Sequence, residues 1–179
     1  MAAAGEEPIQ PLIPTPVTDA QYETLTHFIS SLEGQWTGSD HRTECLGDIE
    51  RPQTRVTDYS ASGDISFDSG STLRVSLTLQ YDNMSYDDVS LYELTRPMLT
   101  AENNQDGSIT TQARNITPHS AEIYFKGVIA LHREAGSTQG VRPMEHVYEL
   151  SRSGTQLKIE RKIYLSGILV QIDEWKLRK

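Results

Sequence analysis

The segment Thr72-Leu-Arg-Val-Ser-Leu-Thr-Leu-Gln-Tyr81 indicates the fold class of this 179-residue chain. Every second position in it is apolar, namely Leu73, Val75, Leu77, Leu79 and Tyr81. Side chains along a β-strand alternate between the two faces of a sheet, so this pattern predicts a strand with one buried face and one solvated face.

Similar strand patterns occupy most of the remaining chain. Turn-forming pairs such as Ser153-Gly154 and Ser166-Gly167 separate neighbouring strands by a few residues. Short connections are typical of an up-and-down meander of roughly eight to ten strands, and closure would remove both exposed edges. The prediction is therefore an all-β fold, a single closed antiparallel up-and-down β-barrel with one short N-terminal helix. Besides 72–81, strands are expected at 36–45, 53–59, 64–67, 89–94, 98–102, 108–115, 121–133, 142–150, 156–165 and 168–177.

The last expected strand is irregular. Ile168, Val170 and Ile172 share one parity, whereas Trp175 and Leu177 share the other. A β-bulge near Asp173-Glu174 would place both sets on one face.

One amphipathic helix is expected before the first strand. Asp19 suits its N-cap and Gly34 its C-cap. The apolar positions between them recur at steps of three and four residues, so we expect this face to cover one end of the barrel. They are Tyr22, Leu25, Phe28, Ile29 and Leu32.

The first residues differ in composition from the rest. Residues 1–19 are expected to form a flexible strap or lid, and residues 20–179 the barrel domain. Ile9, Leu12 and Ile13 form an apolar cluster among four prolines. These aliphatic residues belong either to a plain linker or to a strap that covers a ligand at the barrel mouth.

Charge and composition exclude several classes of partner. The chain carries a net charge of −9 and has no basic run, which argues against binding nucleic acid or an anionic membrane. No stretch is apolar enough to span a bilayer, and the N-terminus lacks the features of a signal peptide. Cys45 is the only cysteine, so no internal disulfide is possible. We therefore expect a cytoplasmic protein, either a monomer or a homodimer.

No metal or cofactor is expected. The five histidines lack metal-binding spacing. Asp82, Asn83, Asp87 and Asp88 lack the spacing and glycine of a calcium loop, and a solvated hairpin tip explains them better. Phosphate-binding loops and nucleophile motifs are also missing from the sequence.

Arg161 is the most informative candidate residue. It lies on a strand face that is otherwise aliphatic. A buried guanidinium must be paired or must meet an anion or a carbonyl. Arg161 therefore forms an internal ion pair with Glu145, Glu149 or Glu174, or is exposed by a slip in strand register, or contacts a ligand oxygen.

The remaining candidates are apolar or aromatic. Met144, His146 and Tyr148 share one strand face and suit an adaptable apolar pocket with hydrogen-bonding groups, although an ordinary core would look the same. No catalytic residue can be assigned. The full set of predicted ligand-binding residues is Ile9, Leu12, Ile13, Leu77, Tyr81, Tyr124, Phe125, Met144, His146, Tyr148 and Arg161.

Three residues carry a resemblance to a known family. Gly34 and Trp36 form a Gly-x-Trp entry to the first strand, and Arg178 on the last strand could lie across that indole. This arrangement resembles the lipocalin-like (calycin) barrels. The overall plan is similar to the small cofactor-free cyclases of natural-product pathways, the spiro-ring-forming Diels–Alderases, some of which close an N-terminal strap over the substrate.

That resemblance implies a function. The protein would bind a hydrophobic small molecule and promote its cofactor-independent cyclisation or isomerisation, by holding the reacting groups in place. A non-catalytic carrier of a hydrophobic ligand and a bilin-lyase-like chromophore-binding protein are the alternatives. The absence of a titratable motif does not decide between them.

Overall fold

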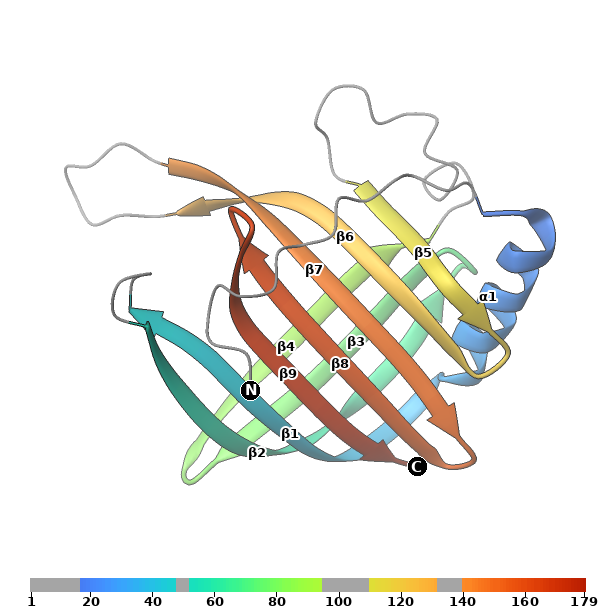
Figure 1. The fold of residues 1–179 in the computed structure, drawn as a ribbon. Coiled ribbons are helices and arrows are strands. Elements are labelled where there is room, and N and C mark those ends of the chain that lie inside the picture. The colour runs from blue at the N-terminus through green and yellow to red at the C-terminus, as the bar shows by residue number, and fades with distance from the viewer. Residues whose placement is uncertain (1–16, 48–51, 95–109, 132–139) are drawn as a thin grey trace.

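The computed structural model describes residues 17–47, 52–94, 110–131 and 140–179. They form one helix, α1, and nine strands arranged in a single antiparallel sheet (Figure 1). The elements are α1 (Asp19–Ser31), β1 (Gly34–Gly47), β2 (Pro52–Asp68), β3 (Thr72–Tyr81), β4 (Met84–Glu93), β5 (Thr110–Thr117), β6 (Ser120–Leu131), β7 (Gly140–Ser153), β8 (Gln156–Leu165) and β9 (Ile168–Arg178).

The strands follow an up-and-down order that supports the all-β prediction. Their order across the sheet is β4-β3-β2-β1-β9-β8-β7-β6-β5, so the first and last strands pair in the middle and β4 and β5 form the edges. The sheet curls into an open half-barrel, not the closed barrel expected from the sequence (Figure 1). No ladder joins β4 to β5 within the described residues, and the strand predicted at 98–102 lies outside them.

Two strands match their predicted bounds, and one pair of predictions was wrong. Thr72–Tyr81 and Gln156–Leu165 form strands as expected. The segments predicted separately at 53–59 and 64–67 form one long strand, β2. Gly63 lies inside this strand, directly opposite Trp36, and not in a turn.

The predicted bulge is also misplaced. The pairing of β8 with β9 is regular through Asp173 and Glu174 and shifts between Ile163 and Tyr164. Asp173 shares the inner face with Trp175 and Leu177, so the apparent change of parity reflects a buried carboxylate.

Helix α1 covers one end of the half-barrel, as expected. It buries Leu25, Phe28 and Ile29 against the core. Its caps differ from the prediction: Thr18 is the N-cap and forms a capping box with Gln21, while Leu32 is the C-cap. Gly34 begins β1 with φ of +116°, a conformation that favours glycine.

The two tryptophans lie in the core, but Arg178 does not cover the first one. Trp36 and Trp175 are fully buried, and the Trp36 indole donates to the Leu32 carbonyl at 2.7 Å. Arg178 is exposed, and the Nζ atom of Lys179 lies 5.0 Å from the centre of the Trp36 ring. The contact with the Trp36 ring that was predicted for Arg178 is thus made by Lys179.

The one helix of the described residues could not cross a bilayer.

Candidate functional site

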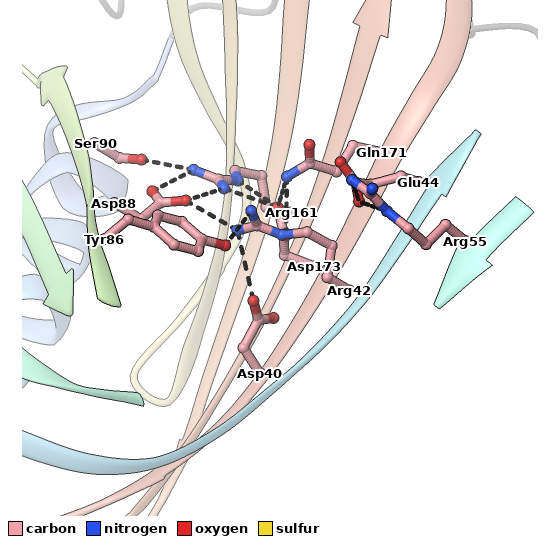
Figure 2. Close-up of polar contacts among 10 residues, drawn as sticks. All are labelled: Asp40, Arg42, Glu44, Arg55, Tyr86, Asp88, Ser90, Arg161, Gln171 and Asp173. Carbon is pink, nitrogen blue, oxygen red and sulfur yellow. Dashed lines mark hydrogen bonds and ion pairs between the residues drawn. The ribbon is translucent and has the colours of Figure 1, made fainter. Parts of the chain in front are cut away.

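Charged residues line the middle of the inner face. Arg42 on β1, Asp173 on β9, Arg161 on β8 and Tyr148 on β7 are directly opposite one another across four neighbouring strands. Asp40 lies two residues before Arg42 on the same face. Together with Asp88 from the edge strand β4, the five charged residues form what we call the inner cluster (Figure 2).

The Arg161 guanidinium is hydrogen-bonded to side chains of the protein itself. Its Nε atom donates to Asp173 at 2.8 Å, and its terminal nitrogens donate to the two oxygens of Asp88 at 2.8 and 2.6 Å. Ser90 accepts a further bond at 3.0 Å, and the guanidinium lies 4.7 Å from the centre of the Trp175 ring. Arg161 therefore forms internal ion pairs, one of the three alternatives, but its partners are Asp88 and Asp173 and not the predicted glutamates.

The glutamates considered as partners lie elsewhere. Glu145, Glu149 and Glu174 alternate with inner-face residues along their strands and so point to the outer face of the sheet.

Arg42 joins the same carboxylates from the other side. It donates to Asp173 through Nε and to Asp88 through Nη2, the latter at 3.1 Å. Its guanidinium also lies 5.4 Å from the ring centres of both Tyr59 and Tyr86. Asp88 and Asp173 thus each accept from two arginines, and the four side chains form a neutral, closely paired unit.

The carboxylates of this cluster respond differently to burial. Burial pushes the pKa of Asp88 upwards, but hydrogen bonds and charge from Arg161 and Arg42 bring it below its ordinary value. Burial raises the pKa of Asp40 to about 7, and the charge of Asp173 adds to this effect despite the two arginines. Asp40 Oδ2 lies 3.5 Å from Arg42 Nη2, farther than the carboxylates of Asp88 and Asp173 lie from the arginines. The cluster has three aspartates and two arginines, and Asp40 is the aspartate without a close arginine partner.

An aromatic wall lies beside the inner cluster. Tyr92 on β4 packs against Tyr148 and Phe125, with ring centres 5.1 and 6.0 Å apart, and its hydroxyl is 3.4 Å from His146 Nδ1. Burial, reinforced by the charge of Arg161, lowers the pKa of His146 to about 4, so its imidazole is neutral at pH 7. Tyr92 and Tyr148 are fully buried, whereas Phe125, Met144 and His146 are only partly buried.

The structure brings together some of the predicted site residues. Phe125, Met144, His146, Tyr148 and Arg161 occupy neighbouring positions of the inner face on β6, β7 and β8. Leu77 lies on the same face across the interior, buried opposite Asp88 on β3 and β4.

The other predicted residues lie apart from this group. Tyr81 is 43% exposed near the β3–β4 turn, where it packs on Tyr59. Tyr124 points to the outer face, where its hydroxyl donates to Glu145 at 2.7 Å. Ile9, Leu12 and Ile13 lie outside the described residues.

Sequence reasoning missed four members of the inner cluster. Asp40 and Arg42 lie four and six residues after Trp36 and so share the face of that buried indole, but polar residues on both faces of β1 hide this signal in the sequence. Asp173 lies two residues before Trp175 and shares the face of that indole. Asp88 was interpreted as part of a solvated hairpin tip, yet its side chain is only 15% exposed.

Two hollows on the surface are lined by described residues. One, of about 230 Å³, lies over β6, β7 and β8 and is lined by Glu122, Glu149, Glu160 and Lys158 among others. The other, of about 300 Å³, lies between α1 and the β5–β6 and β7–β8 turns, beside His27, His119 and Arg152. No group of three His, Cys, Asp or Glu in the described part of the chain is arranged to hold a metal ion.

Comparison with known proteins does not assign a family. No family model matches the sequence, and no curated protein matches it. A solved structure titled as a tesB protein from Mycobacterium avium subspecies paratuberculosis is 10% identical, with a TM-score of 0.26 over 94% of this chain and 89% of that chain. A score this low carries no argument about fold or activity, so the function must be argued from the inner face itself.

Proposed function

We propose that this protein binds a hydrophobic small molecule against the aromatic end of the inner face and promotes its cofactor-independent cyclisation or isomerisation. The ligand would lie against Phe125, Met144 and His146, above the buried rings of Tyr92 and Tyr148. The middle of the inner face is already filled by the inner cluster, which would form the floor of the site.

One observation carries this proposal: two partly buried apolar side chains share a face with a neutral hydrogen-bonding group. Phe125 lies 5.7 Å from the His146 ring, and Met144 lies two residues before His146 on the same strand face. Because the pKa of His146 is lowered to about 4, the ring can donate or accept a hydrogen bond at pH 7 without carrying charge. An apolar wall with one or two such groups is typical of small-molecule sites.

A site of this kind can promote a ring closure without a catalytic motif. Holding two reacting ends of one molecule together can lower a barrier by roughly 7–11 kcal/mol in favourable cases. A hydrogen bond from Tyr92 or His146 to a developing negative charge on a ligand oxygen would add electrostatic stabilisation. The same surface would also serve a carrier, so binding and turnover need separate tests.

Binding is tested with N-phenyl-1-naphthylamine, a neutral apolar dye whose fluorescence rises in apolar sites. We expect saturable binding to the full chain that Met144→Ala weakens about tenfold, because the side chain loses apolar contact with the dye. Leu91→Ala is the matched control, since Leu91 is an apolar residue that is 52% exposed on edge strand β4. Equal loss in both variants, or loss only in Leu91→Ala, would contradict a site on the inner face.

Turnover is tested on the natural ligand. Native mass spectrometry of the freshly purified protein identifies any small molecule that co-purifies, and that compound or its open-chain precursor is then incubated with the protein. Formation of a cyclised or isomerised product supports the enzyme, and loss of the product in His146→Phe would place the reaction at this wall. Recovery of unchanged compound would favour the carrier.

A further inference from the structure

Three polar side chains in the interior are fully buried without a hydrogen-bond partner among the described residues. They are the Asp40 carboxylate, the Trp175 indole N–H and the Tyr148 hydroxyl. Each residue has 0% of its surface exposed. More than nine in ten buried polar groups in proteins are hydrogen-bonded, so three such groups in one region indicate a missing partner.

These three side chains share one part of the interior. Asp40 on β1 and Trp175 on β9 are directly opposite each other on the inner face, and directly opposed side chains lie about 5 Å apart at Cβ. The ring of Tyr148 lies 5.9 Å from that of Trp175, centre to centre. Arg161 covers the indole from the inner cluster, so the three groups lie in the layer next to the paired charges.

The chemistry of the three groups limits what they can bind. The indole N–H only donates a hydrogen bond and cannot bind a cation, which the nearby Arg42 and Arg161 would also repel. An ionised Asp40 only accepts and would repel an anion. A neutral hydroxyl meets both requirements, because it accepts from the indole and donates to the carboxylate.

We propose that Asp40 and Trp175, together with Tyr148, form an internal site for a neutral hydroxyl group. In the free protein the hydroxyl belongs to a water molecule, since buried waters typically make about three hydrogen bonds to otherwise unpaired groups. When a ligand enters the half-barrel, its own hydroxyl can take the same place. This inference does not depend on the proposed function, because water alone fulfils it.

The site also explains how a sealed carboxyl can exchange its proton. Asp40 has no exposed surface and makes no hydrogen bond to any described residue. A hydroxyl bonded to it supplies the hydrogen-bonded contact that proton transfer requires. Burial raises the pKa of Asp40 to about 7, so this exchange would take place near neutral pH.

The chain contains its own control for a direct test. Its two tryptophans give two indole N–H signals in a proton–nitrogen NMR spectrum of the labelled full chain. The Trp36 indole already donates to the Leu32 carbonyl, whereas that of Trp175 has no protein partner among the described residues. Trp36→Phe assigns the two signals, and contacts to neighbouring protons assign them if that variant does not fold.

We expect a nuclear Overhauser effect between the Trp175 indole proton and a long-lived water, with none at Trp36. This signal should persist in Tyr148→Phe, which excludes relay through the Tyr148 hydroxyl, and disappear in Asp40→Leu, which removes the acceptor. The wild-type comparison remains decisive if Asp40→Leu does not fold.

A titration with phenol tests the other source of the hydroxyl, a bound ligand. If the site takes only a ligand hydroxyl, the water signal will be missing, but phenol will shift the Trp175 indole resonance and benzene, its matched control, will not. A Trp175 indole that shows no water contact and does not respond to phenol would overturn the inference.

Discussion

Asp88 on edge strand β4 and Arg161 on β8 are 73 residues apart in the chain, yet two hydrogen bonds of 2.8 and 2.6 Å join them across the interior. Four strands separate β4 from β8 in the sheet order. Because no ladder joins β4 to β5 in the described residues, this pair ties an edge of the sheet to its middle. The inner cluster therefore helps to hold the curl of the half-barrel.

Asp88→Asn should be strongly destabilising. The change leaves Arg161 and Arg42 buried with one carboxylate fewer, and breaking a buried ion pair typically costs about 3–5 kcal/mol. Urea denaturation would show this as a lower midpoint. Asp87→Asn is the matched control, because Asp87 is the exposed neighbour on the outer face, and its removal should cost about 1 kcal/mol or less. Equal losses in the two variants would contradict a clamp at Asp88.

Much of the fold could be predicted because alternating apolar and polar residues indicate a strand with one buried face. Thr72–Tyr81 and Gln156–Leu165 show that alternation clearly, and their bounds were predicted correctly. Prediction failed where a glycine continues a strand. The prediction ended one strand at residue 59 and began the next at residue 64, but Gly63 continues β2, and its missing side chain allows close approach of β3 within a continuous ladder.

The inner cluster could not be predicted from hydropathy, because hydropathy assigns charged residues to the solvated face, whereas these paired charges lie on the buried face. In β1 polar residues occupy both faces after Trp36, so parity alone does not distinguish Asp40 and Arg42 from their exposed neighbours. Their partners Asp88 and Asp173 come from distant strands. The curvature that brings these strands together is a tertiary property, which local sequence does not express.

Asp40 and His146 should affect the pH dependence of stability in opposite directions. The folded-state pKa of Asp40, about 7 against 3.8, means that the folded protein keeps a proton which the unfolded chain releases. This contribution to stability is present below pH 4 and is lost by pH 7, at up to about 1.4 kcal/mol per pH unit. The pKa of His146 is lowered from 6.5 to about 4, so its neutral form contributes stability above pH 6.5 that is lost as the pH falls to 4.

Between pH 4 and 6.5 the two effects oppose each other, and single variants should separate them. In His146→Gln the free energy of unfolding should fall as the pH rises from 4 to 7, whereas in Asp40→Asn it should rise from pH 4 to 6.5. Urea denaturation at half-unit steps of pH measures both. The groups that face Asp40 are Arg42, Asp88, Arg161 and Asp173, and all four remain in both variants. Parallel curves for the two variants would contradict the assignment.

Gly63→Ala should be more destabilising than a glycine substitution in a turn. A Cβ at Gly63 would lie 2.0 Å from the Ser76 carbonyl oxygen, so β2 and β3 would have to separate. Overpacking of this kind costs typically 1–3 kcal/mol and occasionally more. The control, Gly70→Ala, has φ of +67° and open space around it, so only the strain of about 1–2 kcal/mol applies. A smaller loss at Gly63 than at Gly70, measured by thermal unfolding, would show that the two strands do not pack this closely.

Neutralising one member of a row of acidic residues on the outer face should stabilise the fold. Glu122, Glu149, Glu160 and Glu174 are directly opposite one another across β6, β7, β8 and β9. Like charges placed directly opposite are destabilising, and Glu149 is exposed between two others. Arg114 pairs with Glu122, and Lys158 and Lys162 approach Glu160 at 3.6 and 3.5 Å, whereas Glu149 has no ion pair with a described residue.

We expect Glu149→Gln to raise the free energy of unfolding by about 0.2–1 kcal/mol in low salt. The gain should shrink at about 1 M salt, where the Debye length falls to roughly 3 Å and exposed charges are screened. Glu93→Gln removes an exposed charge from β4 at a position opposite Thr72 and serves as the control. Chemical denaturation of the three proteins in low and high salt distinguishes the outcomes. A loss of stability in Glu149→Gln would contradict repulsion within the row, and an equal gain in Glu93→Gln would mean that net charge and not the cross-strand row governs the effect.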